Sequence, residues 1–332
     1  MGSNQLRERI VRMFLQHEGE VISGEQLRLK LGVSRTAVWK HIKQLRAQGY
    51  AIEAVPSRGY RLDTRPDVLL PIVIKAGLNT AIIAKSIECH VELDSTNLRA
   101  HTLAEQGAPE GSVVVAECQT SGRGRMGRSW SSPPGVNVYT SVVLRPILAL
   151  SEATQLTFLA AVAVARAIEK VCDVRVSVKW PNDILLNGKK IAGLLNELTA
   201  ETEGIHYVVL GIGVNLNMEE SQFPPDLRYP ATSVLLETGQ RVDRVAFIRT
   251  LFTELDALYV LLLERGFAPI RLAWEALFDL VGSAVSVDDG GVGVSVSGVV
   301  IGIAADGALL LDTGSAHPRT IYSGDVRPAT LA

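Results

Sequence analysis

The sequence is poor in cysteine and contains no long apolar run, and both absences exclude whole classes of protein. The three cysteines, Cys89, Cys118 and Cys172, stand far apart, so neither a disulfide framework nor a zinc cluster is expected. The longest apolar run covers residues 158–165 and ends at Arg166, whereas a membrane-spanning helix needs about 20 apolar residues. The charged N-terminus lacks the apolar core of a signal peptide. We therefore expect a cytoplasmic protein that does not bind membranes.

The chain also has little net charge, but this average conceals an uneven distribution. The formal net charge is −2 over 332 residues, of which 47% are hydrophobic and 20% charged, as is typical of globular proteins. Residues 1–64 contain 11 Lys and Arg against 6 Asp and Glu, whereas residues 65–332 contain 22 against 29. A basic end of this kind favours nucleic-acid binding joined to a second function, and the length predicts two or three domains.

The basic end has the pattern of a winged helix-turn-helix. Apolar residues near the N-terminus recur at helical spacing. Ser23 and Gln26 have the spacing of a capping box before a second helix, and Ser34 precedes a third. Residues 50–62 alternate weakly around a turn, which indicates a small hairpin. We therefore predict a winged helix-turn-helix DNA-binding domain over residues 1–64.

The third predicted helix is basic and contains no acid between Gly32 and Gly49. A helix that enters the major groove needs polar residues at its N-terminal end for the bases and cations for the phosphates. The alternative is a solvated helix face in a module that makes only protein contacts. The candidate DNA-contacting residues are Ser34, Arg35, Thr36, Lys40 and Lys43, with Arg58 at the tip of the wing.

Beyond residue 64 the sequence mixes strand and helix patterns and then changes character. Asn187-Gly188 between apolar segments is typical of a type I′ hairpin turn, and Ser151 is suited to cap a long apolar helix. From residue 281 short Val-rich segments alternate with turns, one of them at residues 288–291, which indicates a small β-barrel. We predict an α+β protein with a central mixed-sheet catalytic domain over residues 65–280 and a β-barrel domain over residues 281–332.

The clearest chemical motif is a run of glycines and arginines at residues 121–130. Glycines let the backbone approach a ligand, and arginines supply charge-assisted hydrogen bonds to carboxylate or phosphate. The spacing does not match a Walker loop. A flexible RNA-binding segment is the alternative, but a single copy between two apolar strands favours an anion-binding loop. The candidate residues are Arg123, Gly124, Arg125, Arg128 and Trp130.

Two lysine motifs flank the predicted hairpin. Lys179 begins the run Lys-Trp-Pro-Asn-Asp, and Lys190 begins Lys-Ile-Ala-Gly. Each lysine adjoins apolar positions, where an unpaired ammonium is costly. An anionic ligand relieves that cost, and snorkelling to the surface is the alternative. Asp183 is suited either to hold a divalent cation or to orient a lysine.

A further polar cluster, Ser95-Thr96-Asn97, precedes a predicted helix. This pattern is first of all that of a helix N-cap. Its hydroxyl groups are also suited to bind the polar head group of a ligand.

Together these motifs resemble those of the bifunctional biotin–protein ligases that double as repressors of the biotin operon. The resemblance covers nearly the whole chain and rests on Ser95-Thr96-Asn97, Gln119 and residues 122–125, 179–183, 190–193 and 211–215, in that order. It implies a biotin/lipoate-ligase-like central domain and an SH3-like C-terminal barrel. It also implies that biotin and MgATP form biotinyl-5′-AMP, and that a lysine of the biotin carboxyl carrier protein of acetyl-CoA carboxylase then takes the biotinyl group.

The resemblance also assigns expected roles to individual residues. The expected catalytic residues are Lys190, Arg123, Arg125, Lys179 and Asp183, with Asp183 the candidate ligand for Mg²⁺. The expected biotin contacts are Ser95, Thr96, Asn97, Gln119, Arg123, Gly124, Arg125, Lys190 and Gly193. The expected nucleotide contacts are Arg125, Arg128, Trp130, Lys179, Asn182 and Asn215.

In such bifunctional proteins the adenylate is also the corepressor, which implies a homodimer on operator DNA. The sequence departs from the family pattern at Met126, where another arginine is expected, and at Thr232, where some relatives carry a tryptophan that stacks on adenine. Two alternatives are a ligand-sensing regulator without ligase activity and a lipoate-type ligase. Lys190 and Arg123 argue against the first, and the Gly-Arg-Gly-Arg loop argues against the second.

Overall fold

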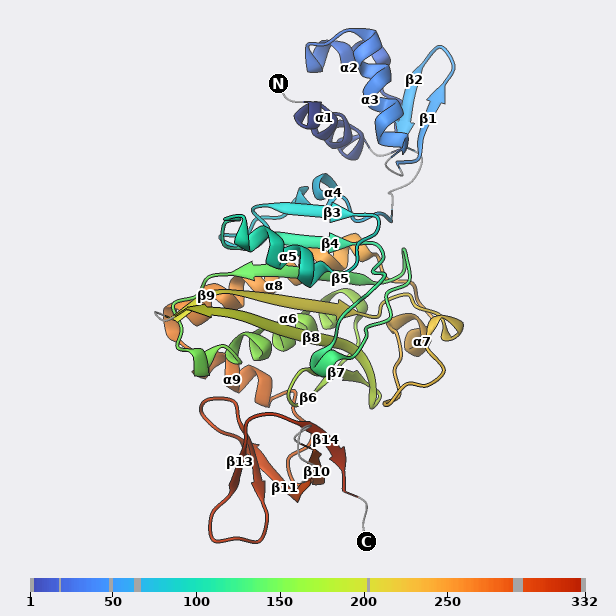
Figure 1. Ribbon diagram of the computed structural model, residues 1–332. Helices are drawn as coiled ribbons and strands as arrows, with labels where there is room; N and C mark the ends of the chain where they lie inside the picture. The colour runs from blue at the N-terminus through green and yellow to red at the C-terminus, as the bar shows by residue number, and fades with distance from the viewer. Residues whose placement is uncertain are drawn as a thin grey trace. The chain divides into compact units, whose positions relative to one another are not determined.

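The computed structural model describes residues 3–17, 19–47, 50–62, 67–201, 204–288 and 295–329 (Figure 1). By its internal contacts the chain separates into two compact units, Met1–Leu78 and Asn79–Ala332. We describe each unit by itself. Within the described ranges, no helix is both long and apolar enough to cross a membrane.

The first unit contains three helices followed by a hairpin, as the sequence predicts. The Ser23 hydroxyl accepts a hydrogen bond from the backbone N–H of Gln26, and the Gln26 side chain accepts one from the backbone N–H of Ser23, so the predicted capping box is confirmed. Val38, Ile42 and Leu45 are buried on the inner face of the third helix. The elements are α1 (Ser3–Gln16), α2 (Gly24–Leu31), α3 (Arg35–Ala47), β1 (Ile52–Val55), β2 (Gly59–Leu62) and α4 (Pro71–Lys75).

The second unit is built on a seven-stranded sheet with the strand order β3-β4-β5-β9-β8-β7-β6. Only the β3–β4 pair is parallel among these described strands, so the sheet is mixed, as predicted. The strands are β3 (Ile87–His90), β4 (Val113–Ala116), β5 (Val138–Leu144), β6 (Ser177–Lys179), β7 (Asp183–Leu186), β8 (Lys189–Glu201) and β9 (Gly204–Val214).

Helices cover both faces of this sheet (Figure 1). On one face, Ala100 and Ala104 of α5 (Thr96–Glu105) pack against Val114, Val143 and Val209. The other face is covered by α6 (Gln155–Cys172), with α8 (Arg244–Arg265) and α9 (Ala268–Glu275) packed against α6. The short helix α7 (Val234–Thr238) lies beyond β9 in the chain.

The start of the long apolar helix differs from the prediction. Residues Leu150–Glu152 form a separate 3₁₀ turn, and α6 begins only at Gln155. The expectation that Ser151 caps this helix is therefore wrong. In its place, the Glu152 carboxylate accepts a hydrogen bond from the backbone N–H of Ala149.

Turn residues fix the β7–β8 hairpin. Asn187 and Gly188 both have positive φ, 51° and 75°, which is the conformation of a type I′ turn. This prediction is confirmed.

The C-terminal strands form a separate antiparallel sheet in the order β13-β12-β11-β10-β14. The predicted turn at residues 288–291 lies almost entirely outside the described residues, and closure into an SH3-like barrel stays a prediction. The strands are β10 (Ala284–Asp288), β11 (Ser295–Ile303), β12 (Leu309–Asp312), β13 (Arg319–Ile321) and β14 (Asp325–Pro328).

Candidate functional site

A pocket lies on the α5 face of the large sheet, and its floor is made of glycines. Gly193 of β8 is paired with Gly213 of β9, and Gly211 lies two residues before Gly213, on the same face of β9. A Cβ atom on Gly211 would lie 2.1 Å from the Asn97 side-chain oxygen, and one on Gly213 would lie 2.6 Å from the Trp130 Nε1 atom. No side chain fits at either position, so the glycines let Asn97 and Trp130, two residues that line the pocket, pack directly against the strand backbone.

The segment of residues 122–130, which we call the Gly-Arg loop, borders the pocket. It contains a short 3₁₀ turn at Arg125–Gly127. At the end of the loop, the Trp130 indole lies against Gly193 and Gly213. Its Nε1 group is buried and has no hydrogen-bond partner among the described residues. Because an unpaired buried donor is unfavourable, this N–H is available to a polar ligand atom.

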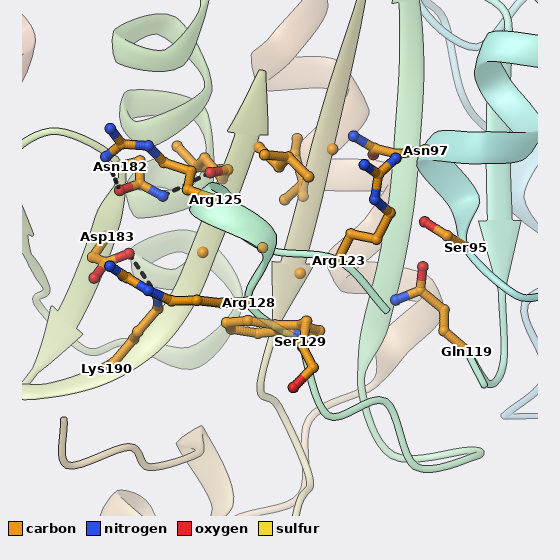
Figure 2. A pocket seen from close by; sticks show the side chains of 18 of the residues that line it. Ser95, Asn97, Gln119, Arg123, Arg125, Arg128, Ser129, Asn182, Asp183 and Lys190 are labelled. Atoms are coloured by element: carbon orange, nitrogen blue, oxygen red, sulfur yellow. Dashed lines mark hydrogen bonds and ion pairs between the residues drawn. The ribbon is translucent and has the colours of Figure 1, made fainter. Parts of the chain in front are cut away.

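The structure brings most of the predicted site residues together around this pocket. Figure 2 shows Ser95, Asn97 and Gln119 on one side and Asn182, Asp183 and Lys190 on the other, with arginines of the loop between them. The predicted residues that line the pocket are Ser95, Thr96, Asn97, Gln119, Arg123, Gly124, Arg125, Arg128, Trp130, Asn182, Asp183, Lys190 and Gly193.

One side of the pocket presents neutral polar groups. Ser95 occupies the N-cap position of α5, but its side chain makes no capping hydrogen bond. Gln119 accepts hydrogen bonds from the Thr96 backbone N–H at 2.9 Å and hydroxyl at 3.1 Å, and it donates one to Ser132 at 2.8 Å. These bonds fix Thr96 and Gln119, while the Ser95 hydroxyl stays available for a ligand.

The other side is cationic. The Lys190 Nζ atom lies 2.7 Å from an Asp183 carboxylate oxygen, and the lysine side chain is only 25% exposed. Lys190 therefore points into the pocket and does not snorkel to the surface. The Asp183 carboxylate is placed to orient this lysine. No cluster of three or more His, Cys, Asp or Glu suited to a metal occurs among the described residues, so a metal-binding role for Asp183 stays a prediction.

The three arginines of the Gly-Arg loop have different partners. Arg125 donates a hydrogen bond to the Asn182 side-chain oxygen at 3.1 Å. Burial lowers the pKa of Arg125, against the opposing effect of nearby Asp325 and Asp183, so an anionic ligand would stabilise this guanidinium. Arg128 pairs with Asp325 of β14, and Arg123 Nη1 lies 3.4 Å from Glu197 of β8.

Lys179 adjoins the pocket but does not line it. Its Nζ atom lies 3.9 Å from the centroid of the Tyr229 ring, which does line the pocket. Burial lowers the pKa of Lys179, whereas Asp183 and Asp325 act to raise it. A half-buried ammonium next to the pocket is suited to attract an anion without touching it.

Asn215 lies outside the pocket lining and is buried. Its Nδ2 group donates a hydrogen bond to the Thr232 carbonyl at 3.1 Å, and its Oδ1 atom accepts one from Asn137 at 3.3 Å. Thr232 is buried as well, and its hydroxyl donates to Glu237 at 2.7 Å. In this structure Asn215 thus supports the segment around Thr232, and its nucleotide contact stays a prediction.

Sequence reasoning missed several lining residues. Gly211 and Gly213 belong to the motif at residues 211–215, but no site role was assigned to them, although alternating glycines inside a strand often mark a close approach. Tyr229 and Asp325 had no local signal, since they reach the pocket only through the fold. The missed lining residues are Ser129, Leu194, Leu195, Gly211, Ile212, Gly213, Tyr229 and Asp325.

A second candidate surface lies on α3 of the first unit. All of the predicted DNA-contacting residues, Ser34, Arg35, Thr36, Lys40, Lys43 and Arg58, are exposed. Trp39, which the sequence analysis did not single out, is 55% exposed among them, and Lys43 Nζ lies 5.5 Å from its ring centroid. An exposed aromatic between cations is suited to contact a base or a sugar.

The fold and the pocket define the class of this protein. The sequence profile of the biotin/lipoate A/B protein ligase family matches residues 91–215, a helix-turn-helix profile matches residues 6–61, and a profile of the biotin protein ligase C-terminal domain matches residues 281–327. The chain is 28% identical to the biotin protein ligase from Aquifex aeolicus, solved in complex with biotin and ATP, at a TM-score of 0.64, covering 74% of this chain and 100% of that one.

Full-length relatives narrow the class to one family. The chain is 41% identical to the bifunctional ligase/repressor BirA of Bacillus subtilis over 97% of this chain and 98% of that protein. It is 35% identical to BirA of Escherichia coli over 89% of each chain. The chain belongs to the family of bifunctional biotin ligase/repressors.

Proposed function

We propose that this protein is an ATP-dependent biotin–protein ligase that activates biotin as biotinyl-5′-AMP and transfers it to a lysine of a biotin carboxyl carrier protein of acetyl-CoA carboxylase. The observation that carries the proposal is the pocket itself. It combines neutral hydrogen-bonding groups on one side with an oriented lysine on the other, over a floor of glycines. This arrangement suits a ligand with a polar, uncharged head and an anionic tail.

The division of charge in the pocket suits the first chemical step. Biotin carboxylate and ATP repel each other, so fixed cations are needed to bring the reacting oxygen to the α-phosphorus. We assign Lys190 to the biotin carboxylate and to the negative charge that develops as the acyl phosphate forms. Asp183 keeps the Lys190 ammonium directed into the pocket. We assign Ser95, Thr96, Asn97, Gln119, Gly124 and Gly193 to biotin.

The nucleotide then extends towards the remaining cations. We assign Arg125, Arg128, Trp130, Asn182 and Lys179 to the nucleotide side, and Asn215 to indirect support of that side. Magnesium binds mostly to phosphate oxygens with few protein carboxylates, and Asp183 stays the proposed protein ligand. When bound, Mg²⁺ would neutralise part of the triphosphate charge. A closed Gly-Arg loop would exclude water from the mixed anhydride.

A direct assay tests this proposal. The protein is incubated with biotin, MgATP and a purified carrier protein, and the carrier is analysed by mass spectrometry for one biotinyl group on one lysine. Lipoate replaces biotin in a parallel reaction. We expect a modified carrier protein in the reaction with biotin and none in the reaction with lipoate. A pure ligand sensor would give no product with either acid, and a lipoate-type ligase would give product with lipoate.

We further propose that the same adenylate acts as corepressor through the winged helix, on a homodimer bound to an operator near biotin biosynthesis genes. The support is the exposed basic face of α3 and the similarity to ligase/repressors along nearly the whole chain. Two recognition helices on a two-fold related operator require a dimer. Sedimentation and gel shift with and without biotin plus MgATP test this, and DNA binding that ignores the ligand would contradict it.

Two further assignments complete the proposal. We infer three functional domains, over residues 1–64, 65–280 and 281–332, supported by the three separate profile matches. We also infer that the protein works in the reducing cytoplasm, because the sequence has few cysteines and no disulfide joins Cys89, Cys118 and Cys172.

A further inference from the structure

Glu197 lies beside the pocket, and the proposed chemistry gives this residue no role. This β8 carboxylate accepts a hydrogen bond from Asn97 Nδ2 at 2.7 Å. The His101 Nε2 atom lies 3.7 Å away, and Arg123 Nη1 of the Gly-Arg loop lies 3.4 Å away. One acid thus connects α5, β8 and the loop.

The Glu197 carboxylate is held in place before the loop reaches it. Asn97 is buried, and its side-chain oxygen accepts a hydrogen bond from the buried Ser141 hydroxyl at 2.6 Å. The neighbouring His101 imidazole, the hydrogen bond from Asn97 and the charge of Arg123 lower the pKa of Glu197, although burial acts to raise it. Glu197 is therefore a fixed anion at neutral pH, with one oxygen directed to the guanidinium of Arg123.

The contacts of Arg125 and Arg128 show how the Arg123–Glu197 pair helps to hold the Gly-Arg loop. Arg128, at the far end of the loop from Arg123, pairs with the carboxylate of Asp325. Arg125 lies between these two arginines in the sequence. Its hydrogen-bond partner among the described residues is the neutral Asn182. Figure 2 shows the Arg123 side chain directed towards Asn97. The arginines at the two ends of the loop are thus paired with acids, whereas the central arginine is bonded to a neutral amide.

We propose that Glu197 is a positioning residue: by holding Arg123, it keeps the Gly-Arg loop closed over the bound adenylate. This inference rests on the proposed function, because it concerns retention of the adenylate. It gives Arg123 the role of an anchor, in place of a direct catalytic contact.

The expected size of the effect follows from the exposure of the pair. The side chains of Arg123 and Glu197 are 44% and 24% exposed, and exposed pairs contribute up to about 1 kcal/mol, which corresponds to roughly a fivefold change in a rate or equilibrium constant. We therefore expect biotinyl-5′-AMP to dissociate roughly fivefold faster from Glu197→Gln than from the wild type.

The experiment compares Glu197→Gln, Arg123→Gln and the double variant in the full-length protein. Glutamine keeps the acceptor for Asn97 but removes the charge that binds Arg123. Labelled biotinyl-5′-AMP is formed in situ, unlabelled biotin and MgATP are added, and the dissociation rate is followed. Glu105→Gln, an exposed position at the end of α5, removes the same charge away from the loop and serves as the control.

If the pair acts as one unit, each single variant speeds dissociation and the double variant is no faster than the singles. Additive effects, or a wild-type rate for Glu197→Gln, would overturn the proposal, and a Glu105→Gln rate equal to that of Glu197→Gln would overturn it as well. A second measurement needs no ligand: trypsin cleavage after Arg125, followed by mass spectrometry, should be faster in Glu197→Gln. If the wild type forms no adenylate, the proposed function fails, while the cleavage rates still decide whether Glu197 anchors the loop.

Discussion

The exposed face of α3 and the pocket of the second unit both gather cations, but they hold those cations in opposite ways. On α3, Lys40 and Lys43 extend into solvent. Arg35 has an acidic partner, Glu25 at 3.2 Å, and neither lysine is seen paired with an acid among the described residues. In the pocket, Lys190 has a carboxylate partner at 2.7 Å, and Arg128 is paired as well. A long polyanion such as DNA can recruit flexible surface cations, whereas a reacting carboxylate and phosphate need cations fixed in advance.

The two sites also differ in what shapes them. The α3 surface is defined by side chains that protrude, including Trp39. The pocket is defined by side chains that are missing, at Gly193, Gly211 and Gly213. This difference predicts that adding one methyl group at a pocket glycine weakens ligand binding. It also predicts that removing a side chain from the α3 surface weakens DNA binding.

The largest effect is expected from Lys190→Ala, which removes the fixed cation. We expect adenylate formation to slow by roughly 10²–10³-fold, as for the loss of one transition-state donor in other enzymes. ATP–pyrophosphate exchange in the presence of biotin measures this step. Asp183→Asn is the matched variant, because it keeps the lysine but loses its orientation, and we expect roughly a tenfold loss. Exchange at half the wild-type rate or faster in Lys190→Ala would refute its role.

The next effect concerns the floor of the pocket. In Gly213→Ala the new Cβ atom would lie 2.6 Å from Trp130 Nε1 and 2.7 Å from its Cε2 atom, so the indole must move into the space proposed for the ligand. We expect biotin affinity, measured by calorimetry, to fall at least tenfold while the circular dichroism spectrum stays unchanged. Unchanged affinity would show that the ligand does not approach β9 at this position.

How much of the fold and of the pocket could be predicted depends on how far apart in the sequence the contacting residues lie. Asn187 and Gly188 carry their turn conformation in their own backbone preferences, and the residues of short motifs such as Lys190 point into the pocket as predicted. Asp325 reaches the pocket only because β14 brings it beside Arg128, a contact that no local pattern encodes. Asn215 is a different case, because this motif residue is bonded to the Thr232 carbonyl inside the fold, and its nucleotide contact stays a prediction.

A smaller effect is expected on the α3 surface. Lys40→Ala should weaken operator binding roughly tenfold or less and reduce the slope of log K against log salt by about 1. Trp39→Ala should weaken binding without changing the slope, since it carries no charge. Fluorescence anisotropy over a salt series separates the two variants. If Lys40→Ala and Trp39→Ala changed the slope equally, the helix would be unfolded or would dock differently in these variants. That result would contradict the proposal that this face of α3 contacts DNA.

The smallest effect compares one acid from each unit. Glu25 and Glu237 both have a pKa lowered to about 2, Glu25 by its hydrogen bond with Arg28 and Glu237 by hydrogen bonds with Asn187 and Thr232. The Glu25 side chain is 42% exposed and that of Glu237 only 12%, so solvent screens the first much more than the second. A carboxylate whose folded pKa is depressed stabilises the protein above its unfolded pKa, near 4.5, and this stabilisation is lost as the pH falls towards 2.

Glu237→Gln should therefore lower the Tm at pH 7 by about 3 °C, with a difference from wild type that narrows between pH 4.5 and pH 3. Glu25→Gln should change the Tm by less at every pH, because its pair lies in solvent on the DNA-binding unit. Differential scanning calorimetry at pH 7, 4.5 and 3 measures both variants. A pH-independent loss in Glu237→Gln would show that the side chain acts through its shape and not its charge. The contrast between a fixed acid of the second unit and a solvated acid of the first unit would then fail at this position.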